Sequence, residues 1–203
     1  MTPRHVTVAV TGASGTCYAQ RALEVLVDAG LEVTLVVSAG GARVAQIEAG
    51  LRIDPEAPDP RVLLRREAVP GNVHGVAVSD IAAGVCSGTH PIDAMIVVPC
   101  SMGTLGRIVA GTAANVVERG ADVMLKEGRP LVLVVRETPL SRIHLENMLR
   151  AHDAGAAIVP ASPGFYHQPE SIADLVDHVL QKAFDRMRVP AELIRRWKVP
   201  RET

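Results

Sequence analysis

The stretch that decides the fold of this chain is Leu131-Val132-Leu133-Val134-Val135, followed directly by Arg136-Glu137-Thr138-Pro139-Leu140. Five consecutive aliphatic residues, mostly β-branched, are typical of a strand buried on both faces inside a parallel sheet. Thr138 can act as a helix N-cap and Pro139 as the first helical residue, so we expect a helix to begin there. Arg136 and Glu137 would then lie at the carboxyl end of a buried strand, where open α/β sheets bind ligands. A solvated ion pair in a loop is the competing interpretation.

Four other aliphatic runs end in small or polar residues in the same way. The runs cover residues 6–10, 33–37, 94–98 and 156–159, and the residues that follow them are 11–15, Ser38, 99–104 and 160–166. A helix is expected from about Thr16 to Ala29, and the alternation of aliphatic runs with helical segments predicts βαβ units. We therefore expect an α/β fold, a Rossmann-like three-layer sandwich with a mostly parallel sheet. Because parallel strands end at one edge, their polar residues would line a single crevice.

Composition narrows the class of protein. The chain has 203 residues and no linker-like stretch, so we expect a single domain over residues 1–203. A net charge of −1 gives no electrostatic basis for binding nucleic acid or an anionic membrane. No apolar stretch approaches the ~18 residues that span a bilayer, and the N-terminus lacks a signal-peptide pattern, so we expect a cytoplasmic protein. No set of His, Cys and carboxylate residues has metal-ligand spacing, so we expect no metal.

The end of the chain has the clearest helical pattern. Ser171 and Asp174 form a capping-box sequence, and an apolar stripe follows. The stripe consists of Ile172, Leu175, Val176, Val179, Leu180, Ala183, Phe184 and Met187. We expect the segment from about residue 170 to residue 203, with Trp197 in its tail, to complete the site. The least regular region lies between Asp54 and Thr89, where a surface excursion or lid is expected.

The turn Gly12-Ala13-Ser14-Gly15 joins the first strand to a helix, and its backbone N–H groups can receive a phosphate. It matches neither GxGxxG nor the P-loop pattern, and Ser38 stands where a dinucleotide-binding protein places Asp or Glu. The crevice therefore suits a mononucleotide such as FMN better, with these polar groups around it: Ser14, Ser38, Ser101, Thr104 and Arg136. A turn that binds no ligand is the alternative interpretation.

Six motifs, in order over nearly the whole chain, resemble those of the UbiX family of flavin prenyltransferases. They cover residues 11–15, 98–105, 121–127, 131–140, 144–149 and 163–169, and the Arg-Glu-Thr-Pro-Leu and His-Leu-Glu-Asn-Met-Leu sequences are highly specific. The resemblance implies transfer of a dimethylallyl unit from dimethylallyl monophosphate to N5 and C6 of reduced FMN. It also implies a homododecamer and a UbiD-type decarboxylase as recipient of the product. The sequence does not distinguish a monophosphate from a pyrophosphate donor.

The resemblance also assigns binding residues. The implied FMN-binding positions are Gly12, Ala13, Ser14, Ser38, Ser101, Met102, Gly103, Thr104 and Arg136. Tyr166 and Lys182 match positions that hold the prenyl phosphate, and Lys126 is expected nearby. A lysine that only extends its ammonium group to water is the competing interpretation of Lys182.

Four residues are implied in the chemistry: Glu137, Glu48, Ser14 and Trp197. Breaking the allylic C–O bond leaves a negative phosphate and a cationic prenyl fragment, so an acid would assist the phosphate and a carboxylate the cation. We expect Glu137 to be desolvated and rigid at its strand end, whereas Glu48 could equally be a solvated helix end. Ser14 would hydrogen-bond the flavin or relay protons, and Trp197 would cover the site with its π face.

The chain departs from the family pattern at Asp80-Ile81, where many members have Asp-Trp, and in residues 82–90. If that aromatic ring normally packs on the prenyl group, substrate preference or activity would change. We expect Cys86 and His90 to be local structural variation. Two other functions stay open: a non-catalytic FMN-binding accessory subunit, and a flavoenzyme of the phosphopantothenoylcysteine decarboxylase type. The second lacks support, because the first turn has no histidine and no Met-Asn motif occurs.

Overall fold

The computed structural model describes residues 2–195, and its centre is a six-stranded sheet in which every strand pairing is parallel. The strand order is β3-β2-β1-β4-β5-β6. The bounds are β1 His5–Val10, β2 Glu32–Val37, β3 Val73–Gly75, β4 Ala94–Cys100, β5 Leu131–Val135 and β6 Ala157–Pro160. The predicted fold class and the five aliphatic strands are confirmed. The sixth strand, β3, was not predicted, because three residues at a sheet edge are too few to show a pattern.

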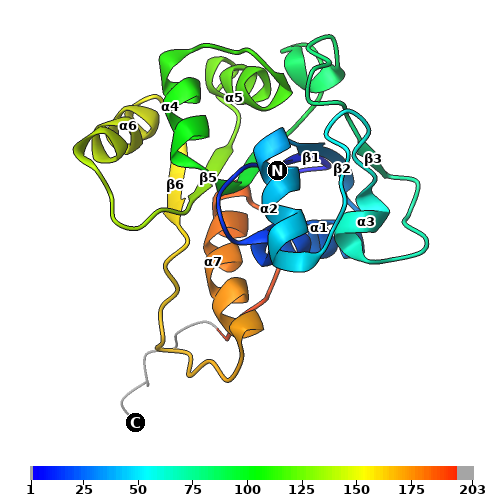
Figure 1. Cartoon of the computed structure of the whole chain (residues 1–203), viewed down its shortest axis with the longest axis vertical. Helices are drawn as coiled ribbons and strands as arrows, with labels where there is room; N and C mark the ends of the chain where they lie inside the picture. Colours follow the sequence, from blue (N-terminus) through cyan, green and yellow to red (C-terminus); the bar gives the residue numbers. More distant parts are fainter. Residues whose placement is uncertain (1, 196–203) are drawn as a thin grey trace.

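Helices cover both faces of the sheet. They are α1 Thr16–Asp28, α2 Ala39–Ala49, α3 Pro60–Leu64, α4 Met102–Ala110, α5 Val116–Lys126, α6 Arg142–Asp153 and α7 Ile172–Met187. Helices α4, α5 and α6 lie together on one side, apart from α1 and α7 (Figure 1). Among residues 2–195, no helix is long and apolar enough to cross a membrane.

Each face of the sheet has its own hydrophobic core. Along β1 the side chains alternate, so that Val6, Val8 and Val10 join the core under α1 and α7 while Ala9 joins the core under α4 and α5. Phe184 of α7 is fully buried in the first core. Burial of such a side chain contributes about 1.5–3 kcal/mol, so α7 is firmly attached along its second half.

The predicted helix start at Thr138 and Pro139 is wrong. Helix α6 begins at Arg142, with Ser141 as its N-cap. The Ser141 hydroxyl accepts a hydrogen bond from the His144 N–H at 3.3 Å, and His144 Nδ1 accepts one from the Ser141 N–H at 3.2 Å. The Thr138 hydroxyl instead donates to the Glu137 carbonyl at 2.8 Å, so it leaves no helix N–H capped. Residues 136–141 therefore form a loop at the end of β5.

The capping box at the start of α7 is confirmed, because Ser171 accepts from the Asp174 N–H and Asp174 accepts from the Ser171 N–H. The apolar stripe is buried from Val176 onward, but its first member, Ile172, is 75% exposed. This end of α7 extends past the sheet (Figure 1), so no core residue covers Ile172. Trp197 lies outside the described residues.

Candidate active site

The ends of β1 and β2 are brought together by glycines. A Cβ on Gly12 would lie 3.2 Å from the Gly40 Cα, and a Cβ on Gly41 only 2.6 Å from the Val10 carbonyl oxygen. Any side chain at Gly41 would therefore push α2 away from the end of β1. Ser38 caps α2 by accepting from the Gly41 N–H at 3.0 Å. The first turn and the start of α2 thus form one wall of the predicted crevice.

The ends of β1 and β4 are joined by hydroxyl groups. Thr11, which is buried, donates to the Pro99 carbonyl at 2.8 Å and accepts from the Ser101 N–H at 2.9 Å. Ser101 caps α4 by accepting from the Thr104 N–H at 3.3 Å, and the Ser101 and Thr104 hydroxyls lie 3.0 Å apart. The structure therefore brings Ser101 and Thr104 to the same sheet edge as the first turn, as predicted. The adjacent Cys100 is buried, which raises the pKa of its thiol to about 12 and keeps it protonated.

Glu48 reaches from α2 to the start of α1. Its carboxylate accepts from the Gly15 N–H at 3.1 Å and from the Thr16 N–H at 2.8 Å. Burial raises the pKa of Glu48, but hydrogen bonds from Ser14, Thr16 and Gly15 outweigh it and hold the pKa at about 2. Glu48 is therefore ionised at neutral pH and caps α1, rather than being an ordinary solvated helix end. The Gly15 N–H, one of the groups in the first turn that the sequence offers to a phosphate, is therefore already bonded to this carboxylate.

The loop after β5 borders a pocket. Its walls come from the ends of β5 and β6 and from α4 and α6: Met102, Val135, Arg136, Glu137, Thr138, Leu140, Met148, Pro160, Ala161 and Ser162. The Arg136 Nε is buried and has no hydrogen-bond partner among the described residues. A buried guanidinium N–H without a partner is costly, so this position suits a ligand with an acceptor group. Arg136 thus fits a flavin or phosphate oxygen in the pocket.

Glu137 lines the same pocket but is exposed, so the expected desolvation of its carboxyl is wrong. Strand β5 ends at Val135 and α6 begins only at Arg142, so Glu137 lies in a loop and its carboxylate is exposed. The Glu137 Oε1 accepts from the Thr138 N–H at 3.1 Å.

Tyr166 and Lys182 lie in one neighbourhood around His178. The Gly164 N–H donates to His178 Nδ1 at 3.2 Å, and the His167 and His178 rings stack 5.0 Å apart. Burial lowers the pKa of His178, and the charges of His167 and Lys182 lower it further, which places Lys182 beside this pair. Tyr166 is 86% exposed, and a Cβ on Gly164 would lie 3.6 Å from its ring.

Lys126 does not join this neighbourhood within one chain. It is the last residue of α5, and α5 runs back to the amino end of β5, the sheet edge opposite the crevice. There it pairs with Glu127, and a Cβ on Gly88 would lie 2.7 Å from its Nζ. Cys86 and His90 also precede β4 at this far edge, and Ile81 is 61% exposed. The expected proximity of Lys126 to Tyr166 and Lys182 is therefore not met by a single chain.

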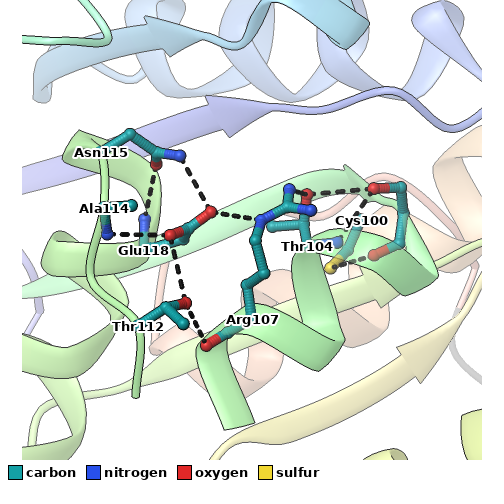
Figure 2. A network of polar contacts seen from close by, with 8 residues as sticks. Cys100, Thr104, Arg107, Thr112, Ala114, Asn115 and Glu118 are labelled. Carbon is teal, nitrogen blue, oxygen red and sulfur yellow. Dashed lines mark hydrogen bonds and ion pairs between the residues drawn. The ribbon is translucent and has the colours of Figure 1, made fainter. Parts of the chain in front are cut away.

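Sequence reasoning missed an ion pair next to Ser101 and Thr104, between the half-exposed Arg107 and the buried Glu118. Arg107 Nε donates to Glu118 at 2.5 Å, and Arg107 Nη2 donates to the Thr104 hydroxyl at 3.3 Å (Figure 2). Glu118 also accepts from the Ala114 N–H and the Asn115 amide, each at 2.9 Å. The available signal was Glu118 itself, a charged residue among the apolar residues of α5 that face the core.

Comparison with known proteins places these features in a family. The family model described as Flavoprotein matches residues 1–184. The chain is similar to the flavin prenyltransferase UbiX of Pseudomonas aeruginosa, with 42% identity over 96% of this chain and 94% of the relative.

Two solved structures are similar throughout. AnUbiX (PadA1), in complex with FMN and dimethylallyl pyrophosphate, superposes with a TM-score of 0.85 at 40% identity and covers 97% of this chain and 98% of its own. The dodecameric FMN-dependent UbiX-like decarboxylase of Escherichia coli O157:H7 has a TM-score of 0.83 at 38% identity and covers 96% of this chain and 100% of its own. A PPC decarboxylase mutant is only 16% identical, at a TM-score of 0.56, and shares the fold alone.

Proposed function

The chain belongs to the flavoprotein family and within it to the UbiX flavin prenyltransferases, and from this membership we propose that it prenylates reduced FMN. A dimethylallyl unit passes from dimethylallyl monophosphate to N5 and C6 of the flavin. The observation that carries the proposal is the crevice at the ends of β1, β2, β4 and β5, in a chain whose relative binds FMN and dimethylallyl pyrophosphate. The low identity to the PPC decarboxylase gives no support to that alternative.

We assign flavin binding to the residues at these strand ends: Gly12, Ala13, Ser14, Ser38, Ser101, Met102, Gly103, Thr104 and Arg136. The unpartnered Nε of Arg136 supports this assignment, because a flavin or phosphate oxygen would satisfy it. The hydroxyls of Ser38 and Ser101 cap α2 and α4 beside the same crevice. No set of three or more His, Cys, Asp or Glu residues within 2–195 is arranged to hold a metal ion.

We assign proton transfer to Glu137 and cation stabilisation to Glu48. Reduced FMN supplies the nucleophilic N5 and C6 positions. Glu48 is a carboxylate at neutral pH, so it serves to stabilise positive charge on the prenyl fragment and not to donate a proton. Ser14, which hydrogen-bonds Glu48, links that carboxylate to the first turn. Glu137 lines the pocket with Arg136 and remains the candidate acid–base residue. The role expected for Trp197 stays a prediction.

We assign the prenyl phosphate to Tyr166, Lys182 and Lys126, with two copies of the chain contributing. The two lysines are held at different places in one chain, and the similar decarboxylase of E. coli is dodecameric. A homododecamer in which Lys126 of one copy approaches Tyr166 and Lys182 of another would unite three groups that suit a small phosphate.

The proposed reaction also suggests a cellular compartment and a recipient of the product. We propose the cytoplasm, because the acceptor is a reduced flavin and Cys17, Cys86 and Cys100 are free thiols. The resemblance to the UbiX family is the ground on which we propose a UbiD-type decarboxylase as recipient of prenylated FMN.

Incubation of the purified protein with reduced FMN and dimethylallyl monophosphate under anaerobic conditions tests the function. We expect the flavin to gain the mass of one isoprene unit. FMN binding without a mass gain would point to a non-catalytic accessory subunit. That alternative is suggested by Ile81, which stands where many family members have Trp. Addition of the pyrophosphate in a parallel reaction identifies the preferred donor.

A further inference from the structure

The positive charge of Arg107 lies near the N-terminal end of α4, although the residue itself belongs to the C-terminal end. It belongs to the last turn of the helix, yet its guanidinium extends back along the helix toward the first turn, which opens on the crevice. Its Nη2 donates to the Thr104 hydroxyl, and a Cβ on Gly103 would lie 3.4 Å from its Nη1. A positive charge beside a helix N-terminus is unfavourable without a compensating anion.

That anion is Glu118 of α5, and it fixes Arg107 in place. The Glu118 side chain is 1% exposed and accepts hydrogen bonds from Arg107, Ala114, Asn115 and Thr112 (Figure 2). Burial raises the pKa of Glu118, but the hydrogen bonds from Arg107, Ala114 and Asn115 outweigh it, so the pKa lies below its usual value. An ionised, fully bonded carboxylate therefore holds the guanidinium with little freedom to move.

Arg107 in turn decides which way the neighbouring hydroxyl protons point. A guanidinium only donates, so Thr104 Oγ1 must be the acceptor of their hydrogen bond. Thr104 is 3% exposed, and its own proton has one acceptor among the described residues, the Ser101 hydroxyl at 3.0 Å. The opposite orientation would leave a buried Thr104 proton beside a positive charge, at a cost of about 1–3 kcal/mol.

The Ser101 oxygen then accepts twice, from the Thr104 N–H and from the Thr104 hydroxyl. Both of its lone pairs are used, so its own proton is the group left for a ligand. We propose that Arg107, held by Glu118, is a positioning residue that makes Ser101 a hydrogen-bond donor toward an acceptor oxygen or nitrogen of the bound flavin. This inference rests on the proposed function, because it needs a flavin in the crevice.

The Arg107→Lys variant separates this role from a structural one. Lysine keeps a cation to pair with Glu118, but one ammonium nitrogen cannot stand at both the Nε and Nη2 positions of Arg107. Water in the place of Nη2 would accept the Thr104 proton, and Ser101 would lose its fixed direction. A structural role predicts that lysine restores wild-type behaviour, whereas the positioning role predicts that it does not.

The measurement is the affinity for oxidised FMN, followed by flavin fluorescence, with thermal unfolding of each variant alongside. We expect Arg107→Lys to weaken FMN binding about three- to tenfold, the range for one hydrogen bond, with a melting temperature close to that of the wild type. In a Ser101→Ala background the same change should alter the affinity less than twofold. Arg61→Lys, at an exposed position of α3, is the matched control and should bind FMN as the wild type does.

Wild-type affinity in Arg107→Lys would overturn the inference. So would losses that simply multiply when Arg107→Lys and Ser101→Ala are combined, because two independent contacts behave in that way. If Arg107→Lys unfolds, Thr104→Val is the second variant: it removes the hydroxyl between Arg107 and Ser101 and keeps the Arg107–Glu118 ion pair. Its effect on FMN affinity should likewise be smaller in a Ser101→Ala background. Failure of the wild type to bind FMN would instead count against the proposed function, before any variant is compared.

Discussion

The two halves of the crevice are built differently. On the flavin half, hydrogen bonds link Thr11, Ser101 and Thr104 at the ends of β1 and β4 and the start of α4, and Gly12 of the first turn lies against Gly40 of α2. On the prenyl-phosphate half, Tyr166 and Lys182 are exposed, and Lys126 is at the opposite edge of the sheet. In one chain, the residues that we assign to the flavin are already held together, whereas those that we assign to the prenyl phosphate are not; we propose that assembly brings the latter together.

The loop after β5 lies between the halves and shares properties of both. The Arg136 Nε is buried at the end of β5, and in this respect Arg136 resembles the residues of the flavin half. Glu137, one residue later, is exposed in the single chain, as Tyr166 and Lys182 of the phosphate half are. Substitutions at these two neighbours should therefore have effects of different kinds.

The largest effect is expected for Glu137→Gln. Glutamine keeps the shape and the hydrogen bonding of Glu137 but cannot transfer a proton, so formation of fully prenylated flavin should fall by roughly 10²-fold or more. Binding of FMN and of the prenyl phosphate should be retained, and a flavin alkylated once but lacking the fourth ring could accumulate. Single-turnover product analysis by mass spectrometry follows both species. Wild-type turnover would remove Glu137 from acid–base chemistry and direct attention to the substrate phosphate.

The next effect concerns Arg136→Ala on the flavin half. Loss of a charge-assisted hydrogen bond should weaken FMN binding by roughly 1.5–3 kcal/mol. Arg142→Ala provides the control, because Arg142 is exposed on α6 and pairs with Glu146 on its own helix. An FMN titration of Arg136→Ala that matches the control would contradict the assignment of Arg136.

A smaller and more selective effect is expected for Lys182→Ala on the phosphate half. The concentration of dimethylallyl monophosphate needed for half-maximal rate should rise about tenfold, as for loss of one charged hydrogen bond, while FMN affinity stays nearly unchanged. Equal losses of both affinities would show that Lys182 supports the fold rather than the phosphate. Steady-state kinetics at saturating FMN, with a separate FMN titration, distinguishes the two.

The smallest effect is expected for the stability change in Glu48→Gln. Burial raises the pKa of Glu48, but hydrogen bonds from Ser14, Thr16 and Gly15 bring it down to about 2, below its usual value. Such a group stabilises the fold at pH values above its unfolded pKa, and the contribution is lost as the pH falls toward 2. The wild type should exceed Glu48→Gln by about 1 kcal/mol between pH 5 and 8, as for a lost helix cap.

Chemical denaturation from about pH 3 to pH 8 provides the check on Glu48. The difference between the two proteins should shrink only below about pH 4.5, where an unperturbed glutamate begins to titrate. A difference that stays constant as the pH falls from about 5 to 3 would mean that Glu48 has no depressed pKa.

The sequence was sufficient for what depends on local pattern. Aliphatic runs predicted β1, β2, β4, β5 and β6, and the rule that parallel strands end together predicted that Ser101 and Arg136 share one edge. It failed at the first turn because a distant partner decides the outcome there: the Glu48 carboxylate accepts from the Gly15 and Thr16 N–H groups. It also failed at the start of α6, where a competing local cap, Ser141 with His144, sets the first residue of the helix instead of Thr138.

Two further features were out of reach for a related reason. The Arg107–Glu118 pair joins two helices, and residues 11 apart on different helices have no periodic relation that a pattern can reveal. Lys126 was expected beside Lys182 because the resemblance unites them, whereas the position of α5 in one chain separates them. A resemblance can assign residues to one site without saying whether one chain holds them together, and we propose that a second copy of the chain supplies Lys126.

The claim that two chains share the residues of the prenyl-phosphate half is tested most directly by mixed assemblies. Lys126→Ala and Lys182→Ala chains, carrying different tags, are co-expressed, and assemblies that hold both tags are purified and assayed. If two copies share each site, random mixing restores intact pairs of lysines at about a quarter of the sites, and activity rises well above that of either variant alone. Activity no higher than the average of the two separate variants would show that both lysines act within one chain, which contradicts the account.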